Sequence, residues 1–523
     1  MDNSSFVDPS SVRTSIKGSF RNTITSSDRH TISQFLLDAE QEIQRNDAEI
    51  NRLRTAIHLL EIKKSGLKKS MDRCHSLLSP VHRLPTEILM EIFIIACEEN
   101  ELCLSSPSDV MKLSSVCGRW WEVIRSAPKL WSSITINFYR WKENFSALEK
   151  LVRLFLDRSD TQLLRLDLYF CSENGIGMLP IIHALHDHAA RWQVLHLNFP
   201  PPTFTLPPSR LGLPALRRLA VFEVHPDTFS SLIKNSPCLH TLEVSNDYTN
   251  FPSDLSSPQI KKLVVTGATI EIVCSHLQRF PALETIHMHG VLGSLSNSNP
   301  NNTEHHLSTT ISSLTFECDD QLCLDATLSH LTLPRLTSLR VCSSEEFWCE
   351  WSTWTGGAVT DFLSRSSCTL TSLCLKDLPI TGDQAISLLE HIPTLVSLEI
   401  EERPRTDEDP EEVPLPNRIM TQTFLQRLVV EHDVFRSLHV FLPLLIDFTI
   451  TMREDDSVVE QGLFNAVASR WIPDPAQAKE VGVKCLESFT ITVLERKGGS
   501  EEKRWLKGLE CFRDGGMRLR INA

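Results

Sequence analysis

The stretch LPALRRLAVFEVHPDTFSSLIKNSPCLHTLEV, residues 213–244, contains one complete unit of the pattern that decides the fold. Two of its segments, LRRLAV from Leu216 and LHTLEV from Leu239, have the form apolar-x-x-apolar-x-apolar, which predicts a short β-strand. A proline precedes each segment, where the chain turns into the strand. The apolar helical pattern DTFSSLIKNSP lies between them. Because a helix can carry the chain back across a sheet, the unit predicts two parallel strands joined by a helix.

The same segment recurs unevenly, about 20 to 40 residues apart, over the rest of the chain. Further copies are LLRLDL from Leu163, IKKLVV from Ile260, LETIHM from Leu283, LTSLRV from Leu336, LTSLCL from Leu370, LVSLEI from Leu395 and LQRLVV from Leu425, with the variants WQVLHL, ISSLTF, LIDFTI and LESFTI. The pattern resembles irregular leucine-rich repeats, although the asparagine that usually closes each repeat is mostly absent. The prediction is a leucine-rich-repeat-like α/β solenoid over residues 132–523, ending in a C-terminal cap, in which each unit packs on its neighbours.

Composition excludes several classes of protein. The chain of 523 residues has 41% hydrophobic and 23% charged residues, which is enough apolar material to fold, and its length favours several domains or a repeat array. A net charge of -14 disfavours nucleic acid as a partner. No secretory leader or apolar run long enough to span a membrane is present, so we expect a cytoplasmic or nuclear protein. The 15 cysteines include no C-x-x-C pair, which predicts reduced thiols.

A heptad pattern precedes the repeats. Residues 1–30 are polar and rich in Ser and Thr, which predicts a disordered tail, and residues 31–79 predict a long helix. Its seam consists of Leu36, Ile43, Ile50, Ile57, Met71 and Leu78, with Ile32, Ala39, Leu53, Leu60, Leu67 and Cys74 three places on. Lys64 and Asn46 interrupt this seam. Two interpretations stay open: a coiled-coil homodimer through residues 31–78, or a helix that folds back against its own chain.

Between the helix and the repeats lies a short helical module, residues 80–131. It contains PVHRLPTEILMEIFIIACEEN (80–100) and DVMKLSSVCGRWWEVIRSAPKLW (109–131). Apolar residues cover a broad arc of its first helix, more than so small a module can bury against itself, so part of that surface is expected to face another chain or domain.

LPTEILMEIF followed by LSSVCGRWWEVI and LW resembles an F-box of the kind common in fungal proteins. In that family the helices bind a Skp adaptor, which links them to a cullin-RING ubiquitin ligase. The resemblance implies adaptor contacts by Leu84, Pro85, Ile88 and Ile92 and a module core of Leu89, Phe93, Val116 and Trp120. The connector from Glu98 to Ser108 is longer than in compact F-boxes.

No catalytic motif is present, and no cofactor or metal site is predicted. The resulting hypothesis is a non-catalytic ligase subunit whose solenoid binds an unknown protein substrate. The alternative is a coiled-coil and leucine-rich-repeat scaffold with no ubiquitin role. Side chains that alternate with buried ones on a strand share the concave face of a solenoid, where substrate contacts are expected. Candidates are Asp167, Tyr169, His196, Phe222, Glu243, His287, His289, Arg340, Lys376, Glu399 and Glu431.

Overall fold

The structure, a computed structural model, describes residues 25–141, 144–170, 177–201, 204, 212–245, 257–290, 306–308, 310–318, 320–343, 351, 353–402, 418–431, 440–453, 457–494 and 504–522. The chain divides into two compact units, Met1–Leu89 and Met90–Ala523. No helix among the described residues is both long enough and apolar enough to cross a membrane.

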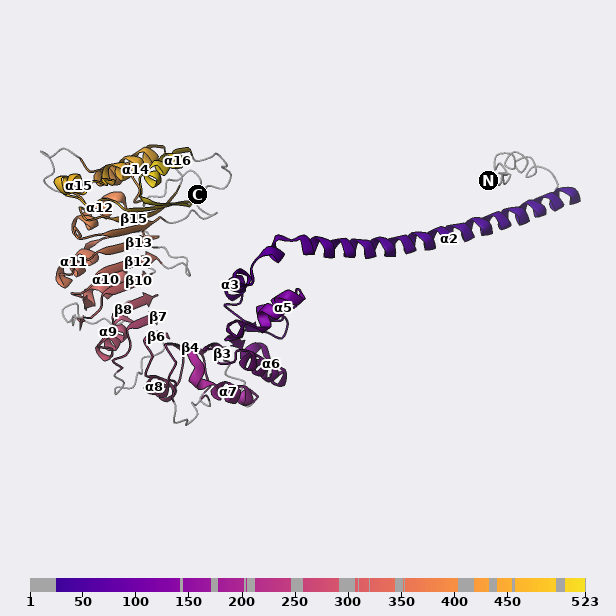
Figure 1. The fold of residues 1–523 in the computed structure, drawn as a ribbon, viewed down its shortest axis with the longest axis horizontal. Helices are drawn as coiled ribbons and strands as arrows, with labels where there is room; N and C mark the ends of the chain where they lie inside the picture. The colour runs from indigo at the N-terminus through magenta and orange to yellow at the C-terminus, as the bar shows by residue number, and fades with distance from the viewer. Residues whose placement is uncertain are drawn as a thin grey trace. The chain divides into compact units, whose positions relative to one another are not determined.

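The first unit is dominated by one helix, α2, Ser26–Leu78, of 53 residues (Figure 1). At 1.5 Å per residue it is about 80 Å long. The predicted tail is therefore wrong for residues 26–30, which are helical, while residues 1–24 lie outside the described part. Ser and Asp favour a helix start, and the first turn here reads SSD. The short 3-10 helix η1, Pro80–Arg83, follows α2.

The helix α3, Thr86–Ala96, leads from the first unit into the second. The α-helices of the second unit are α4 Asp109–Ser114, α5 Gly118–Arg125, α6 Phe145–Arg158, α7 Leu179–His186, α8 Pro226–Lys234, α9 Ile270–Arg279, α10 Gln321–His330, α11 Gly357–Ser366, α12 Gly382–Glu390, α13 Gln422–Leu428, α14 Ser457–Arg470, α15 Pro475–Val481 and α16 Arg504–Asp514. The 3-10 helices are η2 Pro128–Trp131, η3 Phe138–Trp141 and η4 Ala189–Arg191.

Among the described residues, the second unit is built on one large sheet of 15 strands. In spatial order they are β1 Glu101–Leu102, β2 Ser133–Asn137, β3 Leu164–Tyr169, β4 Trp192–Asn198, β5 Arg218–Phe222, β6 Thr241–Ser245, β7 Lys262–Thr266, β8 Thr285–His289, β10 Ser313–Cys318, β12 Ser338–Ser343, β13 Ser372–Lys376, β14 Ser397–Glu401, β15 Asp447–Arg453, β16 Ser488–Leu494 and β17 Arg518–Asn522. β9, His306–Leu307, and β11, Leu331–Thr332, form a separate parallel pair. All neighbouring strands of the large sheet are parallel and follow chain order, with helices along its outer side (Figure 1). The predicted α/β solenoid is thereby confirmed as a fold class.

Apolar residues at fixed positions hold successive strands together. In β14, Leu398 and Ile400 are fully buried while the alternating Glu399 is partly exposed. The leucine that opens each segment, such as Leu239 or Leu395, is also fully buried at the turn into its strand. Burying one such side chain contributes about 1.5 to 3 kcal/mol, so each unit is stabilised mainly by the two beside it.

One predicted strand is a helix. LQRLVV was expected to form a strand from Leu425, but residues 422–428 form α13. The hydroxyl of Thr421 accepts a hydrogen bond from the backbone N–H of Phe424, which caps the helix, and Phe424 and Leu425 are both fully buried. Adjacent apolar residues suit a helix packed on the sheet. Glu431 therefore follows a helix and does not lie on a strand.

Arginine side chains from one repeat close the helix ends of the repeat before it. Arg470, 3% exposed, donates to the carbonyl oxygens of Leu428 (2.7 Å), Leu442 (2.9 Å) and Phe441 (2.5 Å). Burial lowers the pKa of Arg470 to about 10. Arg365 similarly donates to the carbonyl of Leu328 at the end of α10. Carbonyl oxygens at a helix C-terminus have no partner within the helix, so a cation there is doubly favourable.

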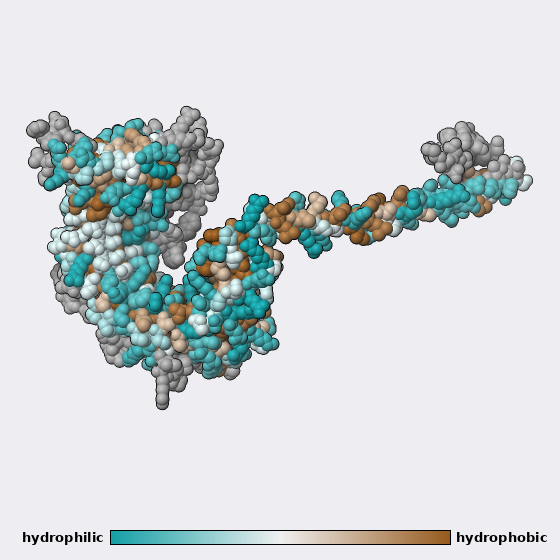
Figure 2. Space-filling model, viewed as in Figure 1, coloured by the Kyte–Doolittle hydropathy of each residue, from teal (hydrophilic) through white to brown (hydrophobic). Residues whose placement is uncertain are grey.

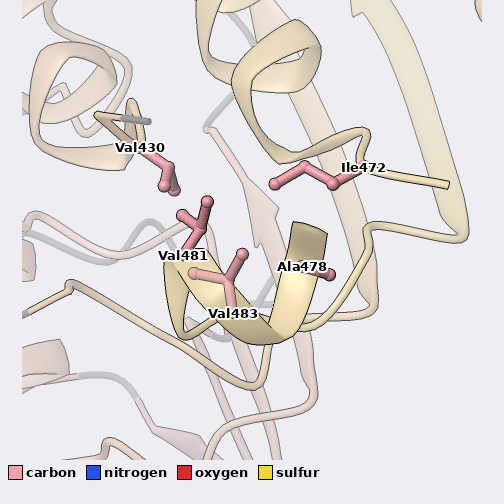
Figure 3. Packing of buried hydrophobic residues seen from close by; sticks show 5 residues of the cluster. All are labelled: Val430, Ile472, Ala478, Val481 and Val483. Carbon is pink, nitrogen blue, oxygen red and sulfur yellow. The ribbon is translucent and has the colours of Figure 1, made fainter. Parts of the chain in front are cut away.

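The C-terminal end of the solenoid has its own apolar packing. Val430, Ile472, Ala478, Val481 and Val483 form a buried cluster around α15 (Figure 3). Gly482 ends α15 with φ +81°, a left-handed conformation that favours glycine. These residues come from the segments before and after β15, so the cluster stabilises the last units of the array from within.

Replacing Arg470 should destabilise this end. Arg470→Leu would leave the three carbonyl oxygens buried without partners, which we expect to lower the free energy of unfolding by about 3 kcal/mol. Faster amide hydrogen exchange in α13 and β15, measured by mass spectrometry, would show it. Arg427→Leu is the matched control, because its partially exposed ion pair with Glu390 (2.9 Å) is worth less than about 1 kcal/mol. Equal exchange in both variants would contradict this role.

Candidate functional site

Helix α3 presents two opposed apolar stripes. Leu89, Phe93 and Cys97, the last just beyond the helix end, follow the i, i+4, i+8 spacing of one helix face, and all three are buried. Ile88, Ile92 and Ile95 on the opposite side are 50%, 45% and 74% exposed. An exposed stripe of three isoleucines on a helix whose other face is already buried is an unfilled contact surface.

The structure places the four predicted adaptor contacts together at the start of this helix. Ile88 and Ile92 lie in the exposed stripe, Pro85 is exposed and Leu84 is partly exposed directly before the helix. Ile95, which belongs to the apolar arc of this helix but not to the four predicted contacts, extends the stripe by one turn. The signal was available in the sequence, because Ile95 follows Ile88 by seven residues and therefore shares its face.

The predicted core of the module needs one correction. Leu89 and Phe93 are buried, and the ring of Phe93 meets that of Trp120 edge-on with centroids 4.8 Å apart. Val116 is 60% exposed and is not part of the core. It lies in the turn between α4 and α5, where its backbone N–H bonds to the carbonyl of Leu113 and its side chain is exposed.

A buried asparagine, not predicted from the sequence, joins the parts of the module. Asn100 is fully buried and donates its side-chain amide to the carbonyl oxygens of Cys97 (3.1 Å) and Leu130 (2.9 Å). Its side-chain oxygen accepts from the N–H of Val110 (3.1 Å), which fixes the N-terminus of α4. Buried polar groups fully satisfied in this way favour one arrangement of the surrounding backbone. The long connector thus forms a defined structure.

The same connector also extends the sheet. Glu101 and Leu102 form β1, which pairs in parallel with Thr135 and Ile136 of β2. The indole N–H of Trp141 donates to the carbonyl of Leu102 (2.8 Å). The helical module from Met90 onward therefore forms the first unit of the solenoid. Its strand β1 belongs to the same sheet as the strands of the repeats.

Ten of the eleven predicted substrate contacts lie on one face of the sheet, the face whose residues alternate with the buried ones; we call it the polar face. Strand pairing sets Asp167, His196, Glu243, His287, Arg340 and Glu399 in one row across β3 to β14. Tyr169, Phe222, His289 and Lys376 lie one step further along their strands. Glu431 is the exception, since it is not on a strand.

Charged groups at the β3–β4 end of the polar face bond to one another. Asp167, 4% exposed, bonds to the ring Nδ1 of His196 and accepts from Arg165 Nε at 3.1 Å. Burial alone would raise the pKa of Asp167, but the hydrogen bond from His196 and the charge of Arg165 outweigh it, and its pKa lies below the ordinary value. Asp167 is thus a fixed negative charge that orients its two neighbours.

Similar pairs continue toward the other end. His289 Nδ1 lies 2.6 Å from Glu317, whose pKa this hydrogen bond lowers. Arg340 Nη2 donates to Glu399 at 2.7 Å, spanning the strand that carries Cys374. The polar face therefore carries fixed charge pairs of both signs, which suits a protein ligand better than a uniformly charged polymer.

Aromatic side chains gather where β3, β4 and β5 end. Tyr169 is 42% exposed, and Phe222 is partly exposed on β5. Phe199, which the strand pattern did not identify, is 48% exposed directly after β4 and has φ +52°. Its backbone N–H bonds to the carbonyl of Phe222 (3.0 Å), which brings their backbones together. Exposed aromatic residues of this kind are common anchors in protein interfaces.

Among the described residues, no group of three or more His, Cys, Asp or Glu side chains is arranged to hold a metal ion. The cysteines described by the structure are free thiols. Burial raises the pKa of Cys342 to about 11 and that of Cys374 still further, so neither is an activated nucleophile.

The folded chain should lose stability in mild acid because of His287, which lies on the polar face. Burial, with the charges of Lys262 and His289, lowers the pKa of His287 from 6.5 to about 4. The unfolded chain therefore takes up a proton as pH falls below about 6.5, while the folded one resists until about pH 4, so stability falls across this window. We expect His287→Gln to reduce the loss of melting temperature between pH 7 and pH 5 by the equivalent of about 1 kcal/mol.

His240→Gln, at an exposed position, controls for the general cost of replacing a histidine. If both variants lose as much melting temperature between the two pH values as the wild type does, His287 does not contribute to the acid sensitivity.

Comparison with known proteins agrees with the geometry of the helical module. No curated protein matches the chain. One similar solved structure is a crystal structure of a Bacteroides fragilis protein, 11% identical, with a TM-score of 0.28, covering 72% of this chain and 82% of that one. The F-box-like family model matches residues 81–137, which include the exposed stripe of α3, Asn100 and β2. The chain contains an F-box-like domain, which begins at the end of its long N-terminal helix and continues into the first full strand of its solenoid.

Proposed function

We propose that the chain is the substrate-recognition subunit of a Skp–cullin–F-box ubiquitin ligase and has no catalytic role of its own. The observation that carries the proposal is the exposed stripe of α3, which lies inside the F-box-like domain. F-box domains bind Skp adaptors, and the adaptor would bring in the cullin and its RING subunit. Such ligases act in the cytoplasm and nucleus, where we place this chain.

The proposed adaptor contacts are Leu84, Pro85, Ile88 and Ile92, with Ile95 added by the structure. Three isoleucines at i, i+4 and i+7 form a continuous ridge that a groove in a partner can accept. Glu91, three residues after Ile88 and four before Ile95, lies beside this ridge and is exposed, so a partner must leave its carboxylate hydrated or offer it a cation. Well-packed apolar anchors at an interface centre supply most of the affinity.

Shortening two of these side chains should release the adaptor without unfolding the helix. Ile88→Ala with Ile92→Ala keeps good helix formers and removes apolar contacts worth more than about 2 kcal/mol, so capture of a purified Skp adaptor should weaken by at least about tenfold. Leu322→Ala is the matched control, because Leu322 is 76% exposed on α10, outside the F-box-like domain. Circular dichroism should show the helices of both variants intact.

A third variant separates binding from folding. Phe93→Ala removes a buried ring that contacts Trp120, so it should disrupt the module and lose adaptor binding together with ordered structure. Wild-type adaptor capture by the Ile88/Ile92 variant would show that the stripe is not the docking surface. If the wild-type chain recovers neither adaptor nor cullin from cell extract, the ligase proposal fails.

We place the substrate on the polar face of the solenoid, which we assign to the irregular leucine-rich-repeat type. Support comes from the ten predicted residues that share this face and from the exposed aromatic side chains at its β3–β5 end. Tyr169, Phe199 and Phe222 would be the anchors, and the fixed charges of Asp167 and Arg340 would select among partners.

The aromatic anchors can be tested before the substrate is known. Proteins that accumulate when the chain is deleted define its substrates, and Tyr169→Ala with Phe222→Ala should fail to restore their turnover while adaptor capture stays normal. Tyr139→Ala is the matched control, because Tyr139 is 57% exposed on η3 rather than on the polar face. Full restoration of turnover by the double variant would exclude these two residues as substrate anchors.

Self-association through α2 is the remaining part of the proposal. The seam residues Ile43, Ile50, Ile57, Leu60 and Leu67 are between 45% and 65% exposed along the helix. Burying them against a second copy would give the ligase two substrate-binding arms. The alternative, a scaffold without a ubiquitin role, would keep this dimer and lack the adaptor, so adaptor recovery distinguishes the two.

A further inference from the structure

We infer that two copies of α2 pair in antiparallel orientation, with Thr55 at the twofold axis. The inference deepens the dimer proposed above and rests on it. Apolar patches recur along the helix surface (Figure 2). In the heptad seam the a positions include Ile43, Ile50 and Ile57, and the d positions include Leu53, Leu60 and Leu67. Ile at a with Leu at d favours two strands in parallel coiled coils, so the apolar seam alone does not decide the orientation.

Charge does decide it, because the two halves of the helix carry opposite charge. Residues 31–51 contain five acidic and one basic residue, a net charge of -4. Residues 52–78 contain seven basic and two acidic residues, a net charge of +5 with His neutral. Parallel pairing would lay like halves side by side, whereas antiparallel pairing lays each half against its opposite.

The individual flanking contacts disfavour the parallel arrangement. In a parallel dimer a g residue faces the e residue five places on in the other helix. Glu42 would face Asp47 and Lys63 would face Lys68, against one favourable contact, Glu49 with Arg54. In addition Lys64, at an a position, would face its own copy inside the seam. Two buried like charges without a partner are strongly unfavourable.

In the antiparallel arrangement Lys64 does not face its own copy inside the seam. There an a residue shares a layer with a d residue of the second copy, and the twofold axis at Thr55 pairs positions whose numbers add to 110. This register places Lys64 in the same layer as Asn46, so each polar interruption meets the other, and an asparagine oxygen can accept from the ammonium. Moving the register by one heptad would set Lys64 against Ala39 or Leu53 instead.

Size also matches in this register. Met71 shares a layer with the small Ala39, and the central layers pair Ile57 with Leu53 and Ile50 with Leu60. Each layer then contains one a residue and one d residue. Alternation of large and small side chains across a layer gives even packing along the coil.

The flanking charges follow the same register. Facing e positions place Glu40 near Lys68 of the second copy, and facing g positions place Glu49 near Lys63. Asp47 near Glu61, and Arg54 near its own copy, are the like-charge contacts. Counted over both copies, four of these contacts are favourable and three are unfavourable, because Arg54 meets its own copy only once. In the parallel dimer two are favourable and four are unfavourable.

The orientation determines where the ligase modules lie. α2 ends at Leu78 and the F-box-like domain begins at residue 81, so each copy carries its docking helix at the C-terminal end of α2. In the antiparallel dimer the two C-terminal ends of the paired segment, residues 32–78, are about 70 Å apart. Two adaptors could then bind without competing for the same space.

Cysteine cross-linking of the full-length protein tests the orientation. Ile43→Cys and Leu67→Cys occupy one layer in the antiparallel register but lie about 36 Å apart along a parallel dimer. A mixture of the two single variants, after exchange of chains and mild oxidation, should yield a disulfide between residues 43 and 67, located by mass spectrometry. Neither variant alone should link to itself, and native Cys74, exposed at a d position, should not link to its own copy.

A charge exchange provides a second readout with opposite signs for the two orientations. Lys68→Glu would face Glu40 in the antiparallel dimer and weaken association roughly tenfold at low salt, whereas in a parallel dimer it would face Lys63 and strengthen association. Adding Glu40→Lys should restore the antiparallel dimer. This pair suits the test better than Glu49, which already forms an intrahelical ion pair with Arg52 at 2.7 Å.

Three results decide the matter. A 43–67 disulfide with weakening by Lys68→Glu and rescue by Glu40→Lys supports antiparallel pairing. Dimers that link only between identical positions overturn the orientation while the proposed dimer stands. A wild-type protein that sediments as a monomer at about micromolar concentration overturns both, and adaptor capture by that same protein would show that the ligase proposal does not depend on them.

Discussion

The parallel backbone ladder of the large sheet is the interaction on which the rest of the second unit depends. Each inner strand bonds to the strand before it and the strand after it in chain order, from β1 to β17. Parallel strands all start at the same end of the sheet. The chain must therefore return to that end through a helix or loop between two strands. The spacing of strands, the outer helices and the single polar face all follow from this one requirement.

A ladder that adds units in one direction has two ends, and the units near these ends are held by different contacts. At the first end the two-residue strand β1 bonds to β2, and Asn100 ties it to α4 and η2. Near the last end α15 and its valine cluster pack between β15 and β16 in chain order, and Arg470 donates to the carbonyl oxygen of Leu428 at the end of α13. Terminal units of a repeat array have a neighbour on one side only, so contacts within the units near an end carry more of their stability.

Features that depend on a repeated local pattern, such as the strand entries and the polar face, could be predicted from the sequence. Leu239, Leu283 and Leu395 mark strand entries because each must be buried at the same point of its unit, and the polar face follows from strict alternation. The role of a residue could not be predicted where it depends on a hydrogen-bond partner that is distant in the sequence. Asn100 looks like a loop residue until Leu130 lies beside it, and Arg470 looks like a helix-surface arginine until Phe441 and Leu442 surround it.

The remaining errors came from patterns that two structures can share. LQRLVV suits a strand or a short buried helix equally well, and its preceding Thr-Gln-Thr, a helix-capping signal at Thr421, was the only local guide. Val116 was assigned to the core because it is apolar in a matching motif, yet a turn between two short helices leaves it in solvent. Apolar character alone does not show on which side of a turn a residue lies.

The distribution of charge differs among three surfaces of the molecule: the polar face, the exposed stripe of α3 and helix α2. On the polar face, charges are held in short pairs such as Arg340 with Glu399, so the fields of the two charges largely cancel at a distance. The exposed stripe of α3 consists of isoleucine side chains with the carboxylate of Glu91 beside them, so it offers mainly apolar contact. On α2 the acidic residues lie mainly in the first half and the basic residues in the second, an arrangement that would oppose a parallel second copy and favour an antiparallel one. Because these surfaces lie on different elements, each can change without disturbing the apolar packing that holds the repeats together.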